Sequence, residues 1–228
     1  MPFIGKARLQ MAFGFAKLAS ETSRFLAEHG LTRRDVSDRA LAALERLAAE
    51  RDELQERLAA AEELADRDAL VPVLNRRAFL RELHRTMSEV ERYKTPAAVL
   101  YIDLDGFKAL NDSYGHAAGD AVLHHVGRML MDSVRESDVV GRLGGDEFGV
   151  ILNRAAADEA RAKAWSLSEK INAGAIVHAG VPHRIQASLG VHPIDVREDP
   201  EVAIARADEA MYAEKHARKL DTQAFAAF

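Results

Sequence analysis

Cysteine is missing from the whole chain of 228 residues. Its absence excludes disulfide bonds, thiolate metal sites and thiol nucleophiles together. The composition is compatible with the reducing cytoplasm, where we expect the protein to lie. A metal site in this chain must therefore be built from oxygen or imidazole ligands.

An excess of basic charge is also missing. The chain carries 31 lysines and arginines against 36 aspartates and glutamates, which gives a formal net charge of -5. Nucleic-acid binding proteins use a positive field to attract phosphates, and nothing of this kind extends over the whole chain. We therefore expect no nucleic-acid partner.

Long hydrophobic runs are the third absence. The N-terminal segment 1–18 mixes apolar residues with Lys6, Arg8 and Lys17. Its apolar stretches are too short and too interrupted for a signal peptide or a membrane span. We expect a packed helix there. The alternative is an amphipathic helix that contacts a protein partner or a membrane surface.

The segment 35–65 is rich in Ala, Leu, Glu and Arg and contains neither Gly nor Pro, so it predicts one long helix. Apolar residues in it alternate at spacings of three and four, and Arg51 shares their register. They are Leu44, Leu47, Leu54, Leu58, Ala61 and Ala65. This seam of about three heptads predicts a dimerising coiled coil. The alternative is an amphipathic helix that packs on its own domain.

The pattern changes near Asp66, so we divide the chain into an N-terminal helical region, 1–65, and a second domain, 66–228. Pro72 ends the first pattern, and Asn75 is placed to cap a new helix. Strands are expected at 97–102 and 185–191, and helices at about 112–134, 156–174 and 201–220. Helices that alternate with strands around one hairpin predict an α/β (α+β) fold with a central mixed sheet flanked by helices.

The hairpin is expected within 141–152, where Gly144 and Gly145 precede Asp146 and Glu147. Glycine adopts positive φ without a Cβ clash, so the pair suits a tight turn. A turn that presents two adjacent carboxylates offers oxygen ligands to a hard cation or a proton acceptor to a substrate. An ordinary charged surface turn is the alternative.

Two further carboxylates, Asp103 and Asp105, follow directly after the apolar strand 97–102. Sites in α/β proteins gather where strands end, because loops there stand on a rigid base. If this strand neighbours the hairpin, Asp103 converges with Asp146, and a divalent cation relieves their repulsion. Oxygen ligands without nearby His or Cys select Mg²⁺ or Mn²⁺ over zinc.

The turn after these acids, Gly106 to Lys108, suits a phosphate cradle, although it is not a Walker loop. Asn111 and Asp120 together match the mixed donors and acceptors of a guanine edge. The alternative is that Asn111 and its neighbour Asp112 cap the next helix. The pair His124-His125 lacks metal-ligand spacing, and His116 is expected to serve at a helix start.

Several ordered motifs now resemble one family, the GGDEF diguanylate cyclases. Segment 103–120 reads DLDGFKALNDSYGHAAGD, and GGDEF follows at 144–148. Segment 207–215, ADEAMYAEK, is similar to the closing helix of that family, and 75–79, NRRAF, to its opening one. The resemblance covers about 66–219.

The resemblance implies a palm-like fold that condenses two GTP molecules into cyclic di-GMP and two pyrophosphates. It implies that Asp103, Asp146 and the Leu104 carbonyl hold the metal, and that Glu147 is a further metal ligand or activates the 3′-hydroxyl. Asn111 and Asp120 would hold guanine. The groups implied at the phosphates are Phe107, Lys108, Lys215 and Lys219. Because the product is two-fold symmetric, a homodimer is implied as well.

An Arg-x-x-Asp pattern, Arg135 to Asp138, stands just before the hairpin. In the family this pattern at this place is the inhibitory site for the product, cyclic di-GMP. Arginine offers a planar fork to guanine or phosphate, and aspartate accepts from the guanine edge. A solvated helix end is the alternative.

The chain departs from the family pattern at three places. Val71-Pro72-Val73 stands where the family has Thr-Gly-Leu, Gly106 replaces a bulkier residue, and Arg218-Lys219 replaces Gly-Arg. None of these changes removes a metal ligand, so we expect activity. A module that binds cyclic di-GMP or GTP without turnover is the rival reading. A coiled-coil adaptor would explain only the first sixty-odd residues.

Overall fold

The computed structural model describes residues 24–195 and 197–226, with the side chains of 33, 59–60, 62–64 and 218–226 left out. The chain forms two compact units, Met1–Ala65 and Asp66–Phe228. The helix expected at 1–18 lies outside the described residues. In the described part, no helix is long and apolar enough to cross a membrane.

The first unit holds the short 3-10 helix η1 (Arg33–Asp35) and nearly all of α2 (Asp38–Asp66). The long helix predicted at 35–65 is therefore confirmed, with its start three residues later. Leu47, Leu54 and Leu58 on α2 are 62%, 54% and 58% exposed. Three large apolar side chains on one helical seam are thus left in solvent by this single chain.

The second unit is built on a five-stranded sheet with the order β1-β3-β4-β2-β7. The strands are β1 (Leu74–Asn75), β3 (Val139–Arg142), β4 (Glu147–Asn153), β2 (Ala97–Asp105) and β7 (Gln186–Pro193). β1 pairs with β3 in parallel, and all other pairs are antiparallel. The sheet is mixed, as predicted.

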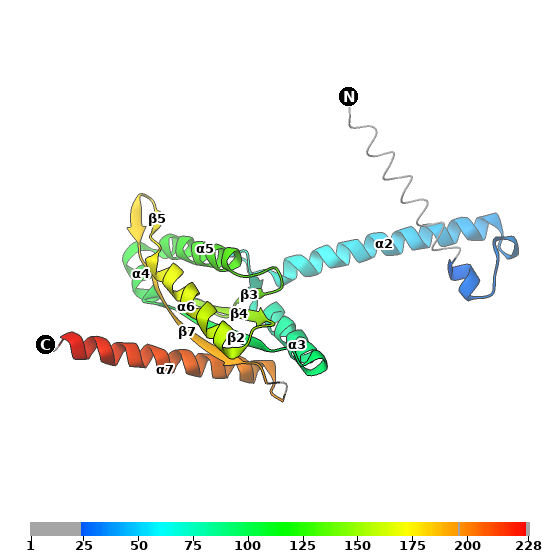
Figure 1. Cartoon of the computed structure of the whole chain (residues 1–228). Coiled ribbons are helices and arrows are strands. Elements are labelled where there is room, and N and C mark those ends of the chain that lie inside the picture. Colours follow the sequence, from blue (N-terminus) through cyan, green and yellow to red (C-terminus); the bar gives the residue numbers. More distant parts are fainter. Residues whose placement is uncertain (1–23, 196, 227–228) are drawn as a thin grey trace, which may run out of the picture. The chain divides into compact units, whose positions relative to one another are not determined.

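Helices cover both faces of this sheet (Figure 1). They are α3 (Arg76–Tyr93), α4 (Phe107–Tyr114), α5 (His116–Ser133), α6 (Ala157–Ala173) and α7 (Pro200–Ala226). A small separate hairpin, β5 (Ile176–His178) with β6 (Val181–His183), follows α6. Helix α3 begins at Asn75 as predicted, because the Asn75 side chain accepts the Ala78 N–H at 3.0 Å.

Side-chain alternation along β2 divides the interior into two cores. Ala98, Leu100, Ile102 and Leu104 point into the first core, with α4, α5 and α6. Ala97, Val99 and Tyr101 point into the second core, with α3 and α7. A strand that is buried on both faces explains why 97–102 is almost entirely apolar.

Two expectations about local structure are wrong. The single helix expected at about 112–134 is two helices, because Gly115 between them has φ +84°. Asn111 and Asp112 lie inside α4 and do not cap the next helix, since α4 already begins at Phe107 and α5 follows Gly115. The hairpin of β5 and β6 was not predicted at all.

Candidate active site

The acids of β2 lie on the α7 face of the sheet. Strand alternation places Asp103 and Asp105 on the same side as Tyr101, which belongs to the second core. In register, Asp103 stands opposite Glu147 of β4 and opposite Ser188 of β7. The chain is still in the strand at these acids, because β2 runs on to Asp105. The expected end of the strand near Ile102 was therefore too early.

The Gly-Gly turn joins β3 to β4 and contacts β2. The Leu143 N–H donates to the Glu147 carbonyl at 2.8 Å, and the Leu104 N–H donates to the Asp146 carbonyl at 3.2 Å. The second bond ties the residue before Glu147 to β2. The predicted neighbourhood of Asp103 and Asp146 therefore follows from the pairing of β2 with β4.

The two glycines of the turn serve a different purpose from the one expected. Glycines with positive φ in the described part are 30, 106, 115 and 180, so Gly144 and Gly145 are not among them. A Cβ on Gly144 would lie 1.9 Å from Oε2 of Glu147, whereas one on Gly145 would meet nothing within 4 Å. Gly144 thus gives space to the Glu147 carboxylate.

Negative charge accumulates at this end of the sheet. Burial, and then the charge of Asp103, raises the pKa of Asp146 above its ordinary range. Burial, and then hydrogen bonding to Glu147, raises the pKa of Tyr101. Asp103, Asp146 and Glu147 therefore influence one another, and a cation between them would offset a real electrostatic cost.

The donor set fits a magnesium-like ion that arrives with its substrate. Among the described residues, no three histidines or carboxylates are arranged as a closed metal cage. Mg²⁺ in nucleotide sites is held by one or two carboxylates together with substrate phosphates, so a closed cage is not required. Burial, followed by the charge of Asp103, raises the pKa of Asp146, so a cation at this corner would favour its charged form.

Lys215 of α7 is the cation that the protein itself supplies. Its Nζ lies 2.7 Å from Oδ1 of Asp105 and also forms an ion pair with Oδ2 of Asp103. Burial opposes the charged form, but the hydrogen bonds that Lys215 donates to Asp103 and Asp105 prevail and raise the pKa of Lys215. Lys215 was predicted at the phosphates and does lie beside the acids.

Arg142, at the end of β3, connects the turn to the start of the domain. Its guanidinium donates to the Gly145 carbonyl at 2.7 Å and 3.2 Å, and to Oδ1 of Asp68 at 3.1 Å. Oδ1 of Asp68 also accepts the N–H groups of Leu70 and Val71. The segment that contains the departure Val71-Pro72-Val73 is thereby linked to the carboxylate-bearing turn.

The residues expected at guanine and phosphate lie around the junction of α4 and α5. Oδ1 of Asn111 is buried without a hydrogen-bond partner, and a Cβ on Gly119 would lie 2.0 Å from it. Gly119 precedes Asp120, which is exposed, so Asn111 and Asp120 share one corner. Lys108 is exposed, while the Phe107 ring is buried in the first core and leaves only its main chain for a phosphate.

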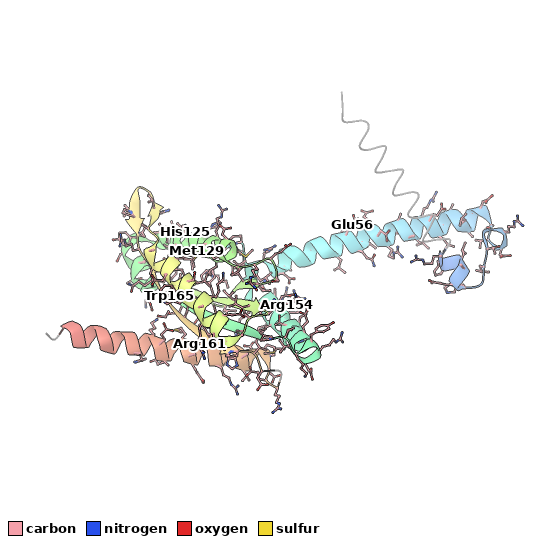
Figure 2. The ribbon with its side chains drawn as sticks, viewed as in Figure 1. Glu56, His125, Met129, Arg154, Arg161 and Trp165 are labelled. Carbon is pink, nitrogen blue, oxygen red and sulfur yellow. The ribbon has the colours of Figure 1, made fainter. Side chains whose placement is uncertain are left out.

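Arg135 and Asp138 line a separate hollow of about 390 Å³ between the end of β4 and α6. Asp138 accepts the N–H groups of Arg135 at 3.0 Å and of Asn153 at 3.1 Å, so the turn is tightly held. Arg154, which Figure 2 labels in the link from β4 to α6, lines the same hollow. Lys163 of α6 lines it as well. The Arg-x-x-Asp turn thus lies on the wall of a surface hollow, where Arg135 itself is exposed.

Sequence reasoning missed three contributors to the site: Asp105 as a partner of Lys215, Ser188 and Arg142. Asp105 carried a signal, since it alternates with Asp103. The contacts of Ser188 with Asp105 and of Arg142 with Asp68 join residues far apart in the chain, and no local pattern reveals them. The Lys219 side chain lies outside the described part, so its predicted position stays a prediction.

Comparisons with known proteins show which family this chain resembles. Residues 65–220 match the family model described as "Diguanylate cyclase, GGDEF domain". The probable diguanylate cyclase DgcE of Escherichia coli K12 is 39% identical over 153 residues, which are 67% of this chain and 14% of DgcE. The diguanylate cyclase DosC of the same strain is 36% identical over 149 residues, 65% of this chain and 32% of DosC. The chain therefore spans no more than a third of either relative.

Solved structures resemble the chain over its second unit and beyond. The coiled coil and GGDEF domain of DgcB from Caulobacter crescentus, solved with c-di-GMP, has a TM-score of 0.69 and 28% identity, and covers 77% of this chain and 94% of that one. Diguanylate cyclase SiaD from Pseudomonas aeruginosa, in complex with its activator SiaC, has a TM-score of 0.66 and 26% identity, with 93% and 80% covered. On the match of its motifs, its fold and its family model, this chain belongs to the GGDEF domain family of diguanylate cyclases.

Proposed function

We propose that the protein is a diguanylate cyclase, which converts two GTP molecules into cyclic di-GMP and two pyrophosphates. The observation that carries this proposal is the meeting of Asp103, at the end of β2, with the Asp146 turn beside the ammonium group of Lys215. Carboxylates and a lysine in one corner suit a triphosphate with a divalent cation.

The reaction is a phosphoryl transfer that occurs twice. In each transfer the 3′-hydroxyl oxygen of one GTP attacks the α-phosphorus of the other. A new P–O bond forms, the bond from the α-phosphorus to the bridging oxygen breaks, and pyrophosphate leaves. The hydroxyl proton passes to a base, for which Glu147 is our candidate because its carboxylate lies against Gly144 at the turn.

The residues of this chain position the substrate and balance its charge. Asn111 and Asp120 bind the guanine edge. The lysines Lys108, Lys215 and Lys219, together with the Phe107 main chain, hold the phosphates. Asp103 and Asp146, with the Leu104 carbonyl, would hold Mg²⁺ or Mn²⁺, and a further ligand is the alternative role of Glu147. When it is bound, this ion neutralises charge on the phosphates.

Two copies of the domain must cooperate, because the product joins two nucleotides and each domain offers one such corner. The exposed leucines of α2 support a parallel coiled coil that keeps two domains at high effective concentration. SiaD is described as binding an activator, and segment 1–31 of this chain is our candidate for contact with a regulatory protein or a membrane surface. The cytoplasmic location stays a prediction.

Product inhibition is the second part of the proposal. Arg135, Arg154 and Lys163 line a hollow of about 390 Å³ together with Asp138. Glu159 also lines the hollow, so it offers three cations and two carboxylates to a ligand with two phosphates and two guanine edges. The DgcB structures contain c-di-GMP, which makes the product the natural ligand to test here.

Incubation with GTP and Mg²⁺, followed by chromatography for cyclic di-GMP and pyrophosphate, tests the activity. The parent protein should form both products, and Asp146→Ala should form neither while it keeps its helical signal in circular dichroism. A parent protein that binds GTP or cyclic di-GMP and forms no product at high concentration would instead support the sensing module.

A further inference from the structure

Ser188 is a buried hydroxyl that faces the acids of β2. It is 1% exposed, and its Oγ lies 2.9 Å from Oδ2 and 3.1 Å from Oδ1 of Asp105. A serine has one proton to donate, so both carboxylate oxygens share it and the plane of the Asp105 carboxylate is oriented by Ser188. The roles proposed above assign Ser188 nothing.

Strand β7 also determines where Lys215 stands. A Cβ on Gly190 would lie 2.0 Å from the Ala207 carbonyl and 2.3 Å from the Met211 nitrogen, so α7 packs directly on the backbone of β7. Gly190 and Ser188 lie two residues apart on one face of the strand. Met211 and Lys215 lie four apart on one face of the helix. The close contact at Gly190 therefore brings Lys215 over Ser188 and Asp105.

Lys215 contacts two carboxylates, and a bound divalent cation would affect these two contacts differently. Its ammonium group contacts both Asp103 and Asp105. A divalent cation on Asp103 competes for the same negative charge, and it weakens the hold of Asp103 on Lys215. Asp105 is then the anchor that keeps the ammonium group beside the incoming phosphates, and Ser188 keeps Asp105 turned toward it.

We propose that Ser188 and Asp105 are positioning residues, which act through Lys215 to hold the terminal phosphates of GTP. This inference rests on the proposed role of Lys215. It predicts that removal of the Ser188 hydroxyl weakens binding of the triphosphate and leaves binding of a nucleoside monophosphate unchanged, because GMP lacks the phosphates that Lys215 reaches.

The test is a double-mutant cycle measured by calorimetry at fixed Mg²⁺, with GTP whose α–β bridging oxygen is replaced by methylene, so that no turnover occurs. We expect Ser188→Ala to weaken binding of this analogue about three- to tenfold. In a Lys215→Ala background the same change should have no further effect. Ser188→Thr keeps the hydroxyl and should restore affinity. If the Ser188→Thr variant does not fold, Asp105→Asn replaces it in the test. Asp105→Asn should weaken binding of the analogue, and it should have no further effect in the Lys215→Ala background.

The matched control is Ser168→Ala. The Ser168 hydroxyl lies 3.5 Å from the carbonyl of Ala187, the neighbour of Ser188, and Ala187 belongs to the opposite core. Its removal should leave analogue affinity unchanged.

Equal losses for the analogue and for GMP, or an undiminished loss in the Lys215→Ala background, would overturn the inference and leave the cyclase proposal standing. A Lys215→Ala variant with parental analogue affinity would refute the proposed role of Lys215, and this inference with it.

Discussion

The two faces of the sheet differ in what the end of β2 presents to them. On the α5 and α6 face, apolar residues continue through Leu104, so the first core reaches the end of the strand. On the α3 and α7 face, the apolar series stops at Tyr101, and Asp103 and Asp105 follow. One strand thus completes a core on one side and supplies charged groups on the other.

This difference shows how a site is made without a large cleft. The second core is interrupted at one end, and the small size of Gly190 lets α7 approach the backbone of β7 closely there. Burial, and then the charge of Asp103, raises the pKa of Asp146, which is a cost to the folded protein when that carboxylate is charged. Changes to the apolar core residues of the first face should therefore affect stability, and changes to the acids at the end of β2 on the second face should affect chemistry.

The largest effect is expected at Asp103, on the second face. Asp103→Asn removes a carboxylate that we assign to the metal, and the rate of cyclic di-GMP formation should fall on the order of a thousandfold or more. Asp112→Asn is the matched control, because Asp112 is exposed on α4 and has no assigned role. A variant of Asp103 with a rate within tenfold of the parent would remove it from the site.

A core residue on the first face should behave in the opposite way. Leu130 of α5 is fully buried in the first core. Leu130→Ala should lower the free energy of unfolding by about 2–5 kcal/mol in urea titrations. Met131→Ala, at a neighbour 41% exposed, should cost far less. The turnover number of folded Leu130→Ala should stay near that of the parent. A large fall in the turnover number of Leu130→Ala without loss of stability would contradict the difference between the two faces of the sheet.

The Arg135 hollow adds a regulatory function to the first face. Arg135→Ala should raise the concentration of cyclic di-GMP needed for half inhibition by about tenfold or more, because a charge-assisted fork is lost. Arg161→Ala is the control, since Arg161 on α6 pairs with Asp158 and lies outside the hollow (Figure 2). Inhibition as tight as in the parent would exclude this pocket as the product site.

A smaller effect is expected in the first unit. Leu54→Gln places a polar group on the exposed seam of α2 and should weaken self-association about tenfold in sedimentation experiments. Activity should fall at dilute enzyme and recover at high concentration. Glu56→Gln introduces the same residue at an exposed position outside the seam. It should change neither self-association nor activity at dilute enzyme. Equal masses for parent and Leu54→Gln at all concentrations would contradict the coiled coil.

Local signals in the sequence predicted much of this fold. Asn75, as a helix-capping residue, predicted the start of α3, and an uninterrupted run of helix-forming residues predicted α2. The break at Gly115 was missed because the apolar spacing of α5 extends smoothly toward it. The short strands β5 and β6 are too brief for a periodic signal.

The candidate site was predictable only in its acids and lysines. The pairing of Ser188 with Asp105 joins residues 83 apart, and that of Arg142 with Asp68 joins residues 74 apart. Both depend on strand register, which the sequence alone does not fix. The sequence also did not show why residue 144 is a glycine. The Glu147 side chain occupies the space that a Cβ on Gly144 would need, and the backbone φ does not require glycine there.

The most direct test of the account is the melting temperature of the metal-free protein and of Asp146→Asn as a function of pH. The native pKa of Asp146 is raised, so its charged form destabilises the fold above that pKa, and the cost disappears as pH falls toward the ordinary value. We predict that Asp146→Asn melts higher than the parent at neutral pH, and that the difference shrinks on acidification. A variant that melts lower than the parent at neutral pH would contradict the claim that this end of the sheet carries uncompensated charge for its function.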